Sequence, residues 1–266
     1  MANLSSPITL VGIGRSGTTL LENVFKACDD VYATGETGGL IFGTYIGAEA
    51  SFFNSPILDY SSREVYKSSV VRALFDKLFP INDNDHKHWF HKPAGIPKFI
   101  PWNQYKVEGD NSAFPVTWYW HVMNEVFPNS KYICVLRNPW EIVISRVVFS
   151  GWKEEGGWED IKILYDILNY NKKNIYFVFY EDIKNNPKKE ILKLLQELSI
   201  EPPEDLDKII NKKYVPTDVA KLKEAYSLAK GPNYSYLDYE NIINIWNEKG
   251  REFPSPEGKQ SFFFKN

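Results

Sequence analysis

A glycine-rich segment near the start of the chain has the residue types of an anion-binding loop. Residues 12–19 are GIGRSGTT, and they join an apolar run, Ile8–Ile13, to Thr18–Ala27, whose apolar residues recur at helical spacing. Backbone N–H groups of such a loop, with the N-terminus of a helix behind them, attract anions such as phosphate. The segment therefore predicts a strand, an anion-binding turn and a helix.

The glycines of this loop also fit the dinucleotide fingerprint G-x-G-x-x-G. Gly12, Gly14 and Gly17 have the required spacing. Glu36 follows where an acidic residue would hold a ribose. A single match of this kind is weak, and the fingerprint usually has no cation inside the loop, where this sequence has Arg15. An NAD(P)-dependent oxidoreductase stays open on these residues.

A Walker A loop is a second alternative. Gly12 and Gly17 have the correct gap, and Thr19 is suited to the hydroxyl position. Thr18, however, occupies the position of the lysine that reaches the β- and γ-phosphates, which disfavours ATP or GTP chemistry. A ligand-free glycine turn is the plainest alternative, but it gives no reason for an arginine, a serine and two threonines in one loop.

A second segment with phosphate-binding residue types lies much further along the chain. Arg137 follows a buried apolar run, Lys131–Leu136, and Asn138 and Pro139 have the types of a helix cap and a first helical residue. Ser145 follows two turns along that helix. Arginine offers phosphate a planar fork of donors and serine adds a hydrogen bond, so this pair suits a phosphate group. A capped helix with a surface arginine is the alternative.

Alternating strands and helices position these residues. The alternation predicts a parallel sheet with right-handed crossovers, and therefore one α/β domain over residues 1–266, with 200–266 mostly helical. Residues 82–112 form a long connection that suits an active-site loop. Strands are expected at Ile8–Ile13, Val31–Ala33, Lys87–Phe90, Lys131–Leu136 and Ile175–Tyr180, and helices at Thr18–Ala27, Glu64–Phe79, Pro115–Phe127, Pro139–Phe149, Trp158–Tyr170 and Pro187–Leu198.

The composition excludes several classes of function. The 266 residues carry 31 Lys and Arg against 34 Asp and Glu, a formal charge of −3, which argues against a protein that coats nucleic acid or anionic lipid. Two cysteines, Cys28 and Cys134, form neither a disulfide framework nor a four-ligand zinc site. The first residues lack a signal-peptide pattern, and no run reaches the roughly 18 apolar residues of a membrane span. We therefore expect a cytoplasmic protein without a metal.

The glycine-rich loop resembles the 5′-phosphosulfate loop of the sulfotransferases that use 3′-phosphoadenosine 5′-phosphosulfate. In that family a Lys or Arg begins a [KR]-S-G-T-T motif, and the sequence RSGTT matches it here. The resemblance implies that Arg15 places its charge against the 5′-phosphosulfate. The residues implied to offer backbone amides and hydroxyls to the same group are Ser16, Gly17, Thr18 and Thr19.

Two further segments share the resemblance. Arg137 and Ser145 have the spacing with which the family holds the 3′-phosphate, at the same strand-to-helix junction. Tyr180 begins a Y-E-D segment whose tyrosine contacts the adenine in cytosolic sulfotransferases. The resemblance covers about residues 8–200 and implies a P-loop-like sulfotransferase fold. The basic R-K-G loop of many members has only a weak counterpart in Lys249-Gly250-Arg251.

The resemblance offers two candidates for the general base. Glu36 lies in a V-x-x-x-x-E-T segment similar to that of tyrosylprotein sulfotransferases, in which the Glu is the base. Gly38 replaces the arginine that follows there, so a peptidyl-tyrosine substrate is not implied. His91 is the alternative, because other sulfotransferases use a His from a comparable strand end, although their K-x-H order is absent here. Lys92 resembles a lysine that steadies the leaving oxygen.

We therefore expect transfer of a sulfuryl group from 3′-phosphoadenosine 5′-phosphosulfate to a hydroxyl or amine, with release of adenosine 3′,5′-bisphosphate and without a metal. The partner expected is an aromatic or cationic small-molecule acceptor, with no nucleic acid and no membrane; the sequence indicates no oligomeric state. The alternatives are an NAD(P)-dependent oxidoreductase, a degenerate P-loop kinase and a non-catalytic protein that binds the bisphosphate nucleotide. The aromatic residues suited to an acceptor pocket are Trp89, Phe90, Phe99, Trp102, Tyr105, Trp118, Tyr119 and Trp120.

Overall fold

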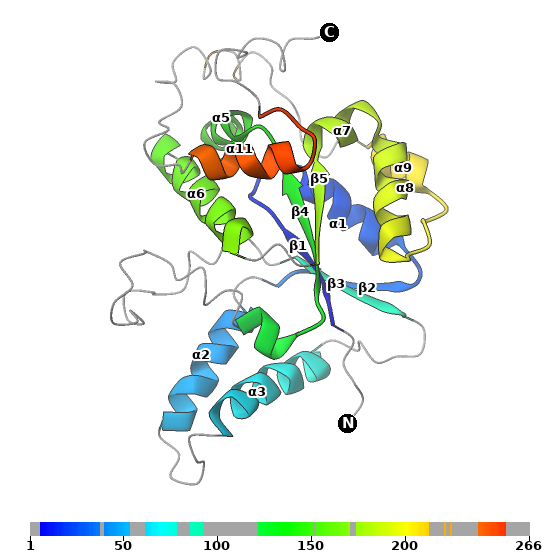
Figure 1. Cartoon of the computed structure of the whole chain (residues 1–266). Coiled ribbons are helices and arrows are strands. Elements are labelled where there is room, and N and C mark those ends of the chain that lie inside the picture. Colours follow the sequence, from blue (N-terminus) through cyan, green and yellow to red (C-terminus); the bar gives the residue numbers. More distant parts are fainter. Residues whose placement is uncertain are drawn as a thin grey trace.

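A five-stranded parallel sheet forms the centre of the molecule (Figure 1). The structure is a computed structural model, and it describes residues 6–37, 40–53, 62–78, 86–92, 122–151, 153–170, 174–212, 221, 224 and 239–253. The strand order is β2-β3-β1-β4-β5, and every neighbouring pair is parallel. The strands are β1 (Ile8–Val11), β2 (Val31–Glu36), β3 (His88–Lys92), β4 (Lys131–Leu136) and β5 (Ile175–Phe179).

β1 lies in the middle of the sheet, and the chain leaves it in both directions. It runs first to β2 at one edge and returns to β3, and later it passes β1 to reach β4 and β5. In open α/β sheets, ligands bind beyond the carboxyl ends of the strands, at the point where the direction of winding reverses. That point is the carboxyl end of β1, from which the glycine-rich loop leads into α1.

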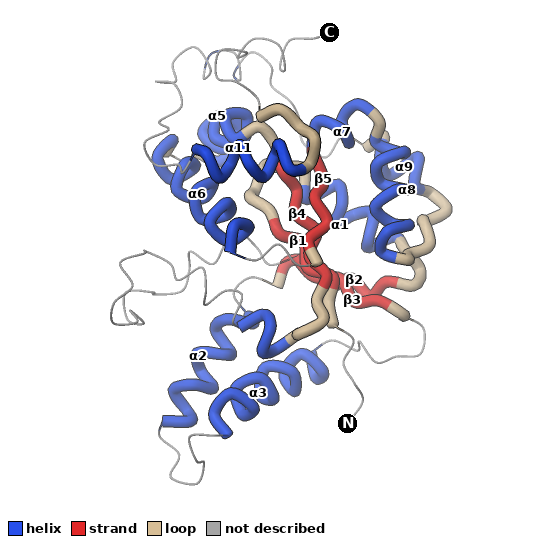
Figure 2. The backbone as a smooth tube through the Cα atoms, viewed as in Figure 1, coloured by secondary structure: helices blue, strands red, loops and turns tan. Residues whose placement is uncertain are grey.

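Helices cover both faces of the sheet, as the tube view in Figure 2 shows. α1, α8 and α9 pack on one face, and α2, α3, α5, α6 and α11 contribute to the cluster on the other. The helices are α1 (Thr18–Ala27), α2 (Leu40–Phe53), α3 (Arg63–Leu78), α5 (Pro139–Ser150), α6 (Glu154–Tyr170), α7 (Tyr180–Asn185), α8 (Pro187–Leu198), α9 (Leu206–Ile210) and α11 (Tyr239–Glu248).

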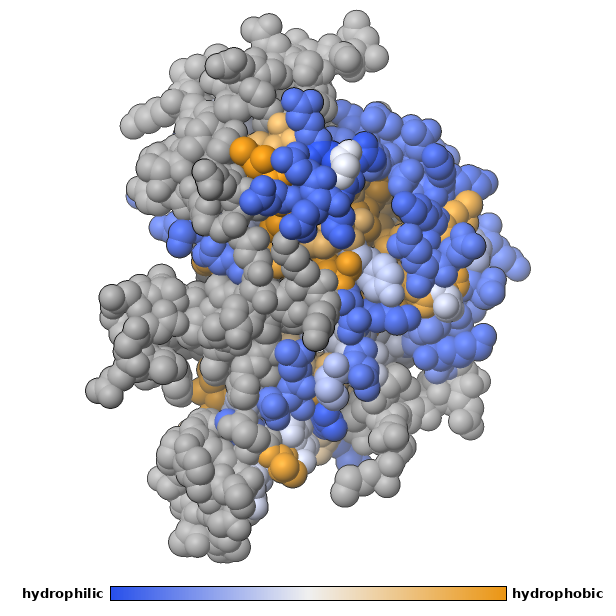
Figure 3. Space-filling view, in the orientation of Figure 1, coloured by the Kyte–Doolittle hydropathy of each residue, from blue (hydrophilic) through white to orange (hydrophobic). Residues whose placement is uncertain are grey.

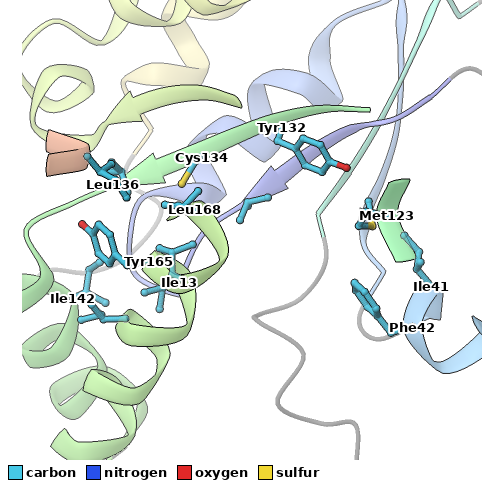
Figure 4. Close-up of a cluster of buried hydrophobic side chains, with 14 of the residues drawn as sticks. Ile13, Ile41, Phe42, Met123, Tyr132, Cys134, Leu136, Ile142, Tyr165 and Leu168 are labelled. Atoms are coloured by element: carbon cyan, nitrogen blue, oxygen red, sulfur yellow. The ribbon is translucent and has the colours of Figure 1, made fainter. Parts of the chain in front are cut away.

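Side chains of β4 alternate between these two cores, as the pleat of a strand requires. Ile133 and Val135 pack with α1 and α8, whereas Cys134 and Leu136 belong to the opposite cluster. Figure 4 shows Leu136 near Tyr165 and Cys134 near Leu168, two residues of α6 in the same cluster. Cys28 and Cys134 are both free and buried.

Most predicted elements are present, with shifted ends. α1, β4 and α8 have the expected bounds, and Asn138 caps α5 by accepting a hydrogen bond from the N–H of Trp140 (3.0 Å). β2 extends to Glu36, and β3 continues to Lys92. Of the expected helix Pro115–Phe127, residues 122–126 are helical; residues 93–112 and 115–121 lie outside the described part of the chain.

The sequence showed no clear period between residues 36 and 60, yet α2 forms there. Ile41, Phe42 and Tyr45 are buried, so the helix does have an apolar face. Two of its exposed positions are glycines, Gly43 and Gly47. The difference in hydropathy between the buried and the exposed face is therefore small, so the sequence shows no clear helical period.

The described surface on the side seen in Figure 3 is mostly hydrophilic, particularly over α7, α8 and α11. Among the described residues, no helix is both long enough and apolar enough to cross a membrane.

Candidate functional site

The residues that the sequence singled out lie at the carboxyl edge of the sheet. Gly12–Gly17 follow β1, Glu36 ends β2, and Lys92 ends β3. Arg137 follows β4, and Tyr180 follows β5. Because all five strands are parallel, their carboxyl ends lie along one edge, and the register places Glu36 opposite Lys92.

Ser16 fixes the turn after β1. Its hydroxyl donates to the Ile13 carbonyl (2.7 Å), and its N–H donates to the same oxygen (3.1 Å). Both donors of this buried residue are thus engaged within the loop. Arg15 and Gly17 have positive φ angles of 79° and 99°. Glycine is required at position 17 because a Cβ there would lie 2.7 Å from Cδ2 of Tyr180.

The remaining N–H groups of the loop have no acceptor in the described part of the protein. These N–H groups belong to the residues just before α1 and to its first residues. The partial positive charge of the helix N-terminus therefore adds to the positive charge of the N–H hydrogens. Such N–H groups form the arrangement that binds phosphate at helix N-termini. The residues concerned are Gly14, Arg15, Gly17, Thr18 and Thr19.

Two guanidinium groups lie beside this loop. Arg15 Nε donates to Ser145 Oγ of α5 (3.0 Å), and its guanidinium lies 4.8 Å from the ring centroid of Phe149. Arg137 Nη1 donates to the Arg15 carbonyl (2.7 Å). Burial and the charge of Arg137 lower the pKa of Arg15. Two like charges held together at the end of a strand favour an anionic ligand.

Arg137 is held by three groups. Its Nε and Nη2 donate to Oε2 of Glu141 (3.0 and 2.8 Å), which lies in the first turn of α5. Its guanidinium stacks on the ring of Tyr180 (4.1 Å to the centroid), and this ring also covers Gly17. A guanidinium has five N–H bonds, of which Glu141 and the Arg15 carbonyl use three, so two are left for a phosphate.

Glu181 connects β5 to the Arg137 junction. Its Oε1 accepts a hydrogen bond from the N–H of Asn138 (3.0 Å), and this ties α7 to the start of α5. Burial raises the pKa of Glu181, and the nearby charge of Glu141 raises it further. Glu141 therefore pairs with Arg137 directly, whereas Glu181 holds the backbone next to it.

A second charged cluster lies where β2 and β3 end. Lys92 Nζ contacts Oε1 of Glu36 (2.6 Å) and Oε2 of Glu22 (2.9 Å), which is a residue of α1. Glu22 Oε1 also contacts Lys26 Nζ (2.6 Å). The side chain of Glu36 is 55% exposed, whereas those of Lys92 and Glu22 are almost buried. The cluster thus presents one carboxylate to solvent and holds one ammonium behind it.

The comparisons with known proteins decide the family. A family model described as the sulfotransferase family matches residues 7–204. The chain belongs to the sulfotransferase family. The matched span agrees with the resemblance expected over residues 8–200. Among curated proteins, none matches this sulfotransferase in sequence.

Two solved structures share the fold of this sulfotransferase. The sulfotransferase domain from the Synechococcus PCC 7002 olefin synthase is 15% identical, with a TM-score of 0.57, and the alignment covers 94% of this chain and 96% of that one. The sulfotransferase domain from the curacin biosynthetic pathway is also 15% identical, with a TM-score of 0.55, and the alignment covers 95% of this chain and all of that one. These likenesses confirm the predicted sulfotransferase fold.

His91 has a different environment from Lys92, its neighbour in the strand. Its ring is fully buried, with Nε2 2.9 Å from Thr9 Oγ1 and Nδ1 3.2 Å from Thr37 Oγ1. Burial lowers the pKa of His91 to about 3. Trp89 lies beside it in the core. The structure therefore separates the two candidate bases of this sulfotransferase, since one is buried and the other exposed.

The C-terminal segment approaches the end of β5. Lys249 Nζ lies 4.8 Å from the ring centroid of Phe177, and the Arg251 guanidinium lies 5.6 Å from that of Phe179. Arg251 also forms an ion pair with Asp182 of α7. The weak counterpart of the family's basic loop is thus on the side of the sheet edge where Tyr180 lies.

Three carboxylates near the predicted cations were missed by sequence reasoning. Glu141 lies four residues after Arg137, and Glu22 lies four residues before Lys26, so each had the spacing of an ordinary helical ion pair. Glu181 was part of the Y-E-D segment, whose tyrosine alone was given a role. Among the described residues, no three His, Cys, Asp or Glu side chains come together as a group that could hold a metal.

Proposed function

We propose that this sulfotransferase transfers the sulfuryl group of 3′-phosphoadenosine 5′-phosphosulfate to a hydroxyl or amine of a small-molecule acceptor. The observation that carries the proposal is the meeting of Arg15 and Arg137 at a loop of unsatisfied N–H groups. A donor with a phosphosulfate and a separate phosphate needs two cationic contacts, and each arginine supplies one.

The donor fits the residues present. The N–H groups of Gly14, Gly17 and Thr18 and the Arg15 guanidinium would hold the 5′-phosphosulfate. The two free N–H bonds of Arg137, with Ser145, would hold the 3′-phosphate. Because Ser145 already accepts a hydrogen bond from Arg15, its hydroxyl hydrogen is free to donate to that phosphate.

Glu36 is the base that we assign to the reaction. The acceptor oxygen or nitrogen forms a bond to sulfur while the bond from sulfur to the bridging phosphate oxygen breaks, and the acceptor proton passes to Glu36. The leaving group is adenosine 3′,5′-bisphosphate. Glu36 is exposed at the end of β2, whereas His91 has both ring nitrogens engaged with threonines inside the core.

Lys92 is the cation that we place beside this reaction. Its ammonium lies 2.6 Å from Glu36 Oε1, so it is next to the atom that receives the proton. A positive charge at this position stabilises the negative charge that develops on the sulfuryl and leaving oxygens. The proposal thus gives Lys92 an electrostatic role and Glu36 the proton transfer.

The acceptor is the part of the proposal that the described residues touch least directly, because most of the expected acceptor-pocket aromatics lie outside them. Trp89 and Phe90 were expected to line an acceptor pocket, but both are fully buried, Phe90 against Phe25 and Trp89 against Phe75. The other aromatic residues of that expectation lie outside the described part of the chain. The two similar solved domains come from an olefin synthase and a biosynthetic pathway, which favours a small-molecule acceptor over a protein.

A transfer assay tests the proposal. The protein is incubated with donor labelled with ³⁵S in the sulfuryl group, together with panels of phenols, aliphatic alcohols and amines. We expect labelled product with at least one panel, and we expect Glu36→Gln to lower the rate at least about 100-fold. Unchanged turnover in Glu36→Gln would remove the base assignment, and no transfer to any acceptor would contradict the proposed activity.

A further inference from the structure

One carboxylate beside the proposed base has no part in the reaction described above. Glu22 lies in the second turn of α1, and its side chain is 10% exposed. Buried carboxylates are normally paired with cations. Both oxygens of Glu22 are occupied, Oε1 by Lys26 and Oε2 by Lys92.

The two lysines that share Glu22 differ in exposure. The Lys26 side chain is 45% exposed and forms an i,i+4 pair on the helix surface. Such pairs on a helix surface contribute little to stability. The Lys92 side chain is 11% exposed and lies between Glu22 and Glu36. The buried contact between Glu22 and Lys92 is therefore the one that fixes the position of an ammonium group.

The backbone before Glu36 is built around the same carboxylate. Gly35 has a φ of 72°, and the register of β2 with β3 shifts between Ala33 and Glu36. A Cβ at Gly35 would lie 3.3 Å from Lys26 Nζ and 3.5 Å from Glu22 Oε1. The end of β2 thus passes directly over the Glu22 side chain. After the register shift, Glu36 pairs with Lys92 of β3.

We infer that Glu22 is a positioning residue that holds the ammonium of Lys92 beside Glu36. The catalytic consequence of this inference rests on the proposed function, whereas the holding itself does not. Glu22 lies one helical turn after Thr18, the first residue of α1, so it ties Lys92 to the helix whose N-terminus forms the anion-binding loop.

The arrangement leaves Glu36 able to accept a proton. When the acceptor proton moves to Glu36, the contact between Glu36 and Lys92 loses one of its charges. Glu22 keeps a negative charge on the other side of Lys92, so the ammonium stays in place. Without Glu22, Glu36 would be the only carboxylate left to Lys92 among the described residues. The base would then be tied to the lysine.

Amine labelling measures the holding directly. Burial by itself would lower the pKa of Lys92, but the hydrogen bonds to Glu36 and Glu22 outweigh it and raise the pKa. The full-length protein without ligand is treated with trace acetic anhydride between pH 7 and pH 10. Mass spectrometry then gives the extent of acetylation of Lys92 at each pH.

Four proteins are compared in this labelling experiment. We expect Lys92 to be protected in the wild type and in Lys26→Met, and Glu22→Gln to increase its labelling at pH 8 about fivefold or more. Glu36→Gln should give a clearly smaller increase, because the buried partner remains. Equal labelling of Glu22→Gln and wild type, or an increase in Glu36→Gln as large as in Glu22→Gln, would overturn the inference. If Glu22→Gln does not fold, protection of Lys92 in Glu36→Gln decides the question.

Turnover then tests the catalytic consequence, with the best acceptor from the panels above. Glu22→Gln should lower kcat about tenfold or more and leave the donor KM within about twofold, since the phosphate contacts are untouched. Lys26→Met is the matched control, and it should keep the wild-type kcat. A loss in Lys26→Met as large as in Glu22→Gln would show that the carboxylate only stabilises α1. If the wild type transfers nothing, the proposed function fails, and the labelling result still decides whether Glu22 holds Lys92.

Discussion

Arg15 has a backbone conformation that L-residues avoid, at a cost of about 1–2 kcal/mol. The loop holds it there because the Arg15 carbonyl accepts Arg137 Nη1 and the Arg15 guanidinium donates to Ser145. The strained residue thus connects the ends of β1 and β4. At the scale of single residues, the site consists of a few such cross-links between strand ends.

A substitution at Gly17 tests the contact between the glycine-rich loop and Tyr180. Gly17→Ala adds a Cβ that clashes with Tyr180, at a φ of 99°. We expect a loss of about 2 kcal/mol or more in the free energy of unfolding, from backbone strain together with the displaced ring. Affinity for adenosine 3′,5′-bisphosphate should fall at least about tenfold, because Tyr180 also supports Arg137. Urea unfolding and calorimetric titration measure the two effects.

Gly14→Ala is the matched control for the stability effect. Apart from its chain neighbours, no atom of the described residues lies within 4 Å of a Cβ at Gly14, and its φ is not positive. Its free energy of unfolding should stay within about 0.5 kcal/mol of the wild type. Equal destabilisation by both substitutions would contradict the packing role given to Gly17.

At the scale of elements, β3 places two adjacent residues, His91 and Lys92, in different environments on its two faces. Successive side chains of a strand point to opposite faces, so His91 lies in one core and Lys92 lies beside α1 on the other face. The sequence placed both near a strand end, but it gave no indication of which face covers which residue. His91 is buried because the fold packs it against Thr9 and Thr37, which are far from it in the sequence.

The low pKa of His91 predicts a specific dependence of stability on pH. The folded protein holds this ring neutral down to about pH 3, whereas an ordinary histidine takes up a proton near pH 6.5. The stabilising contribution is therefore complete above about pH 6.5 and is lost progressively as the pH falls toward 3. Between pH 7 and pH 5 we expect this histidine to lower the free energy of unfolding of the wild type by about 2 kcal/mol.

Urea unfolding of His91→Gln at pH 7, 6 and 5 measures this contribution. Glutamine keeps a donor and an acceptor for the threonines but takes up no proton. The variant should be less stable than the wild type at pH 7, and the difference should narrow by about 2 kcal/mol at pH 5. Parallel curves for the two proteins would contradict the assignment of a buried, neutral ring.

Over the whole molecule, the positions of the predicted phosphate-binding residues follow from the strand order. Arg15, Arg137 and Tyr180 each follow a different strand, and parallel pairing in the order β1-β4-β5 brings them together. The alternation of apolar runs and helices was enough to predict a parallel sheet, but not the order of its strands. The sequence did not show that Glu141 pairs with Arg137, because an acidic residue at helical spacing is indistinguishable from a solvated helix face. It did not show the hydrogen bond from Asn138 to Glu181 either, because these residues are far apart in the chain.

The central claim is that this edge of the sheet binds a nucleotide with phosphates at both the 3′ and 5′ positions. Binding of adenosine 3′,5′-bisphosphate, followed as a shift in melting temperature, tests it most directly, with NADP⁺ and ATP–Mg²⁺ in parallel. Ligand at 100 times its Kd stabilises the folded state by about 2.7 kcal/mol.

Each variant is compared with its own melting temperature without ligand. Arg137→Ala removes a positive charge from the site, and Lys188→Ala removes one from an exposed ion pair on α8. We predict that the bisphosphate alone raises the melting temperature, and that this shift is kept in Lys188→Ala and lost in Arg137→Ala. A shift with NADP⁺ or ATP–Mg²⁺ in place of the bisphosphate, or an undiminished shift in Arg137→Ala, would contradict it.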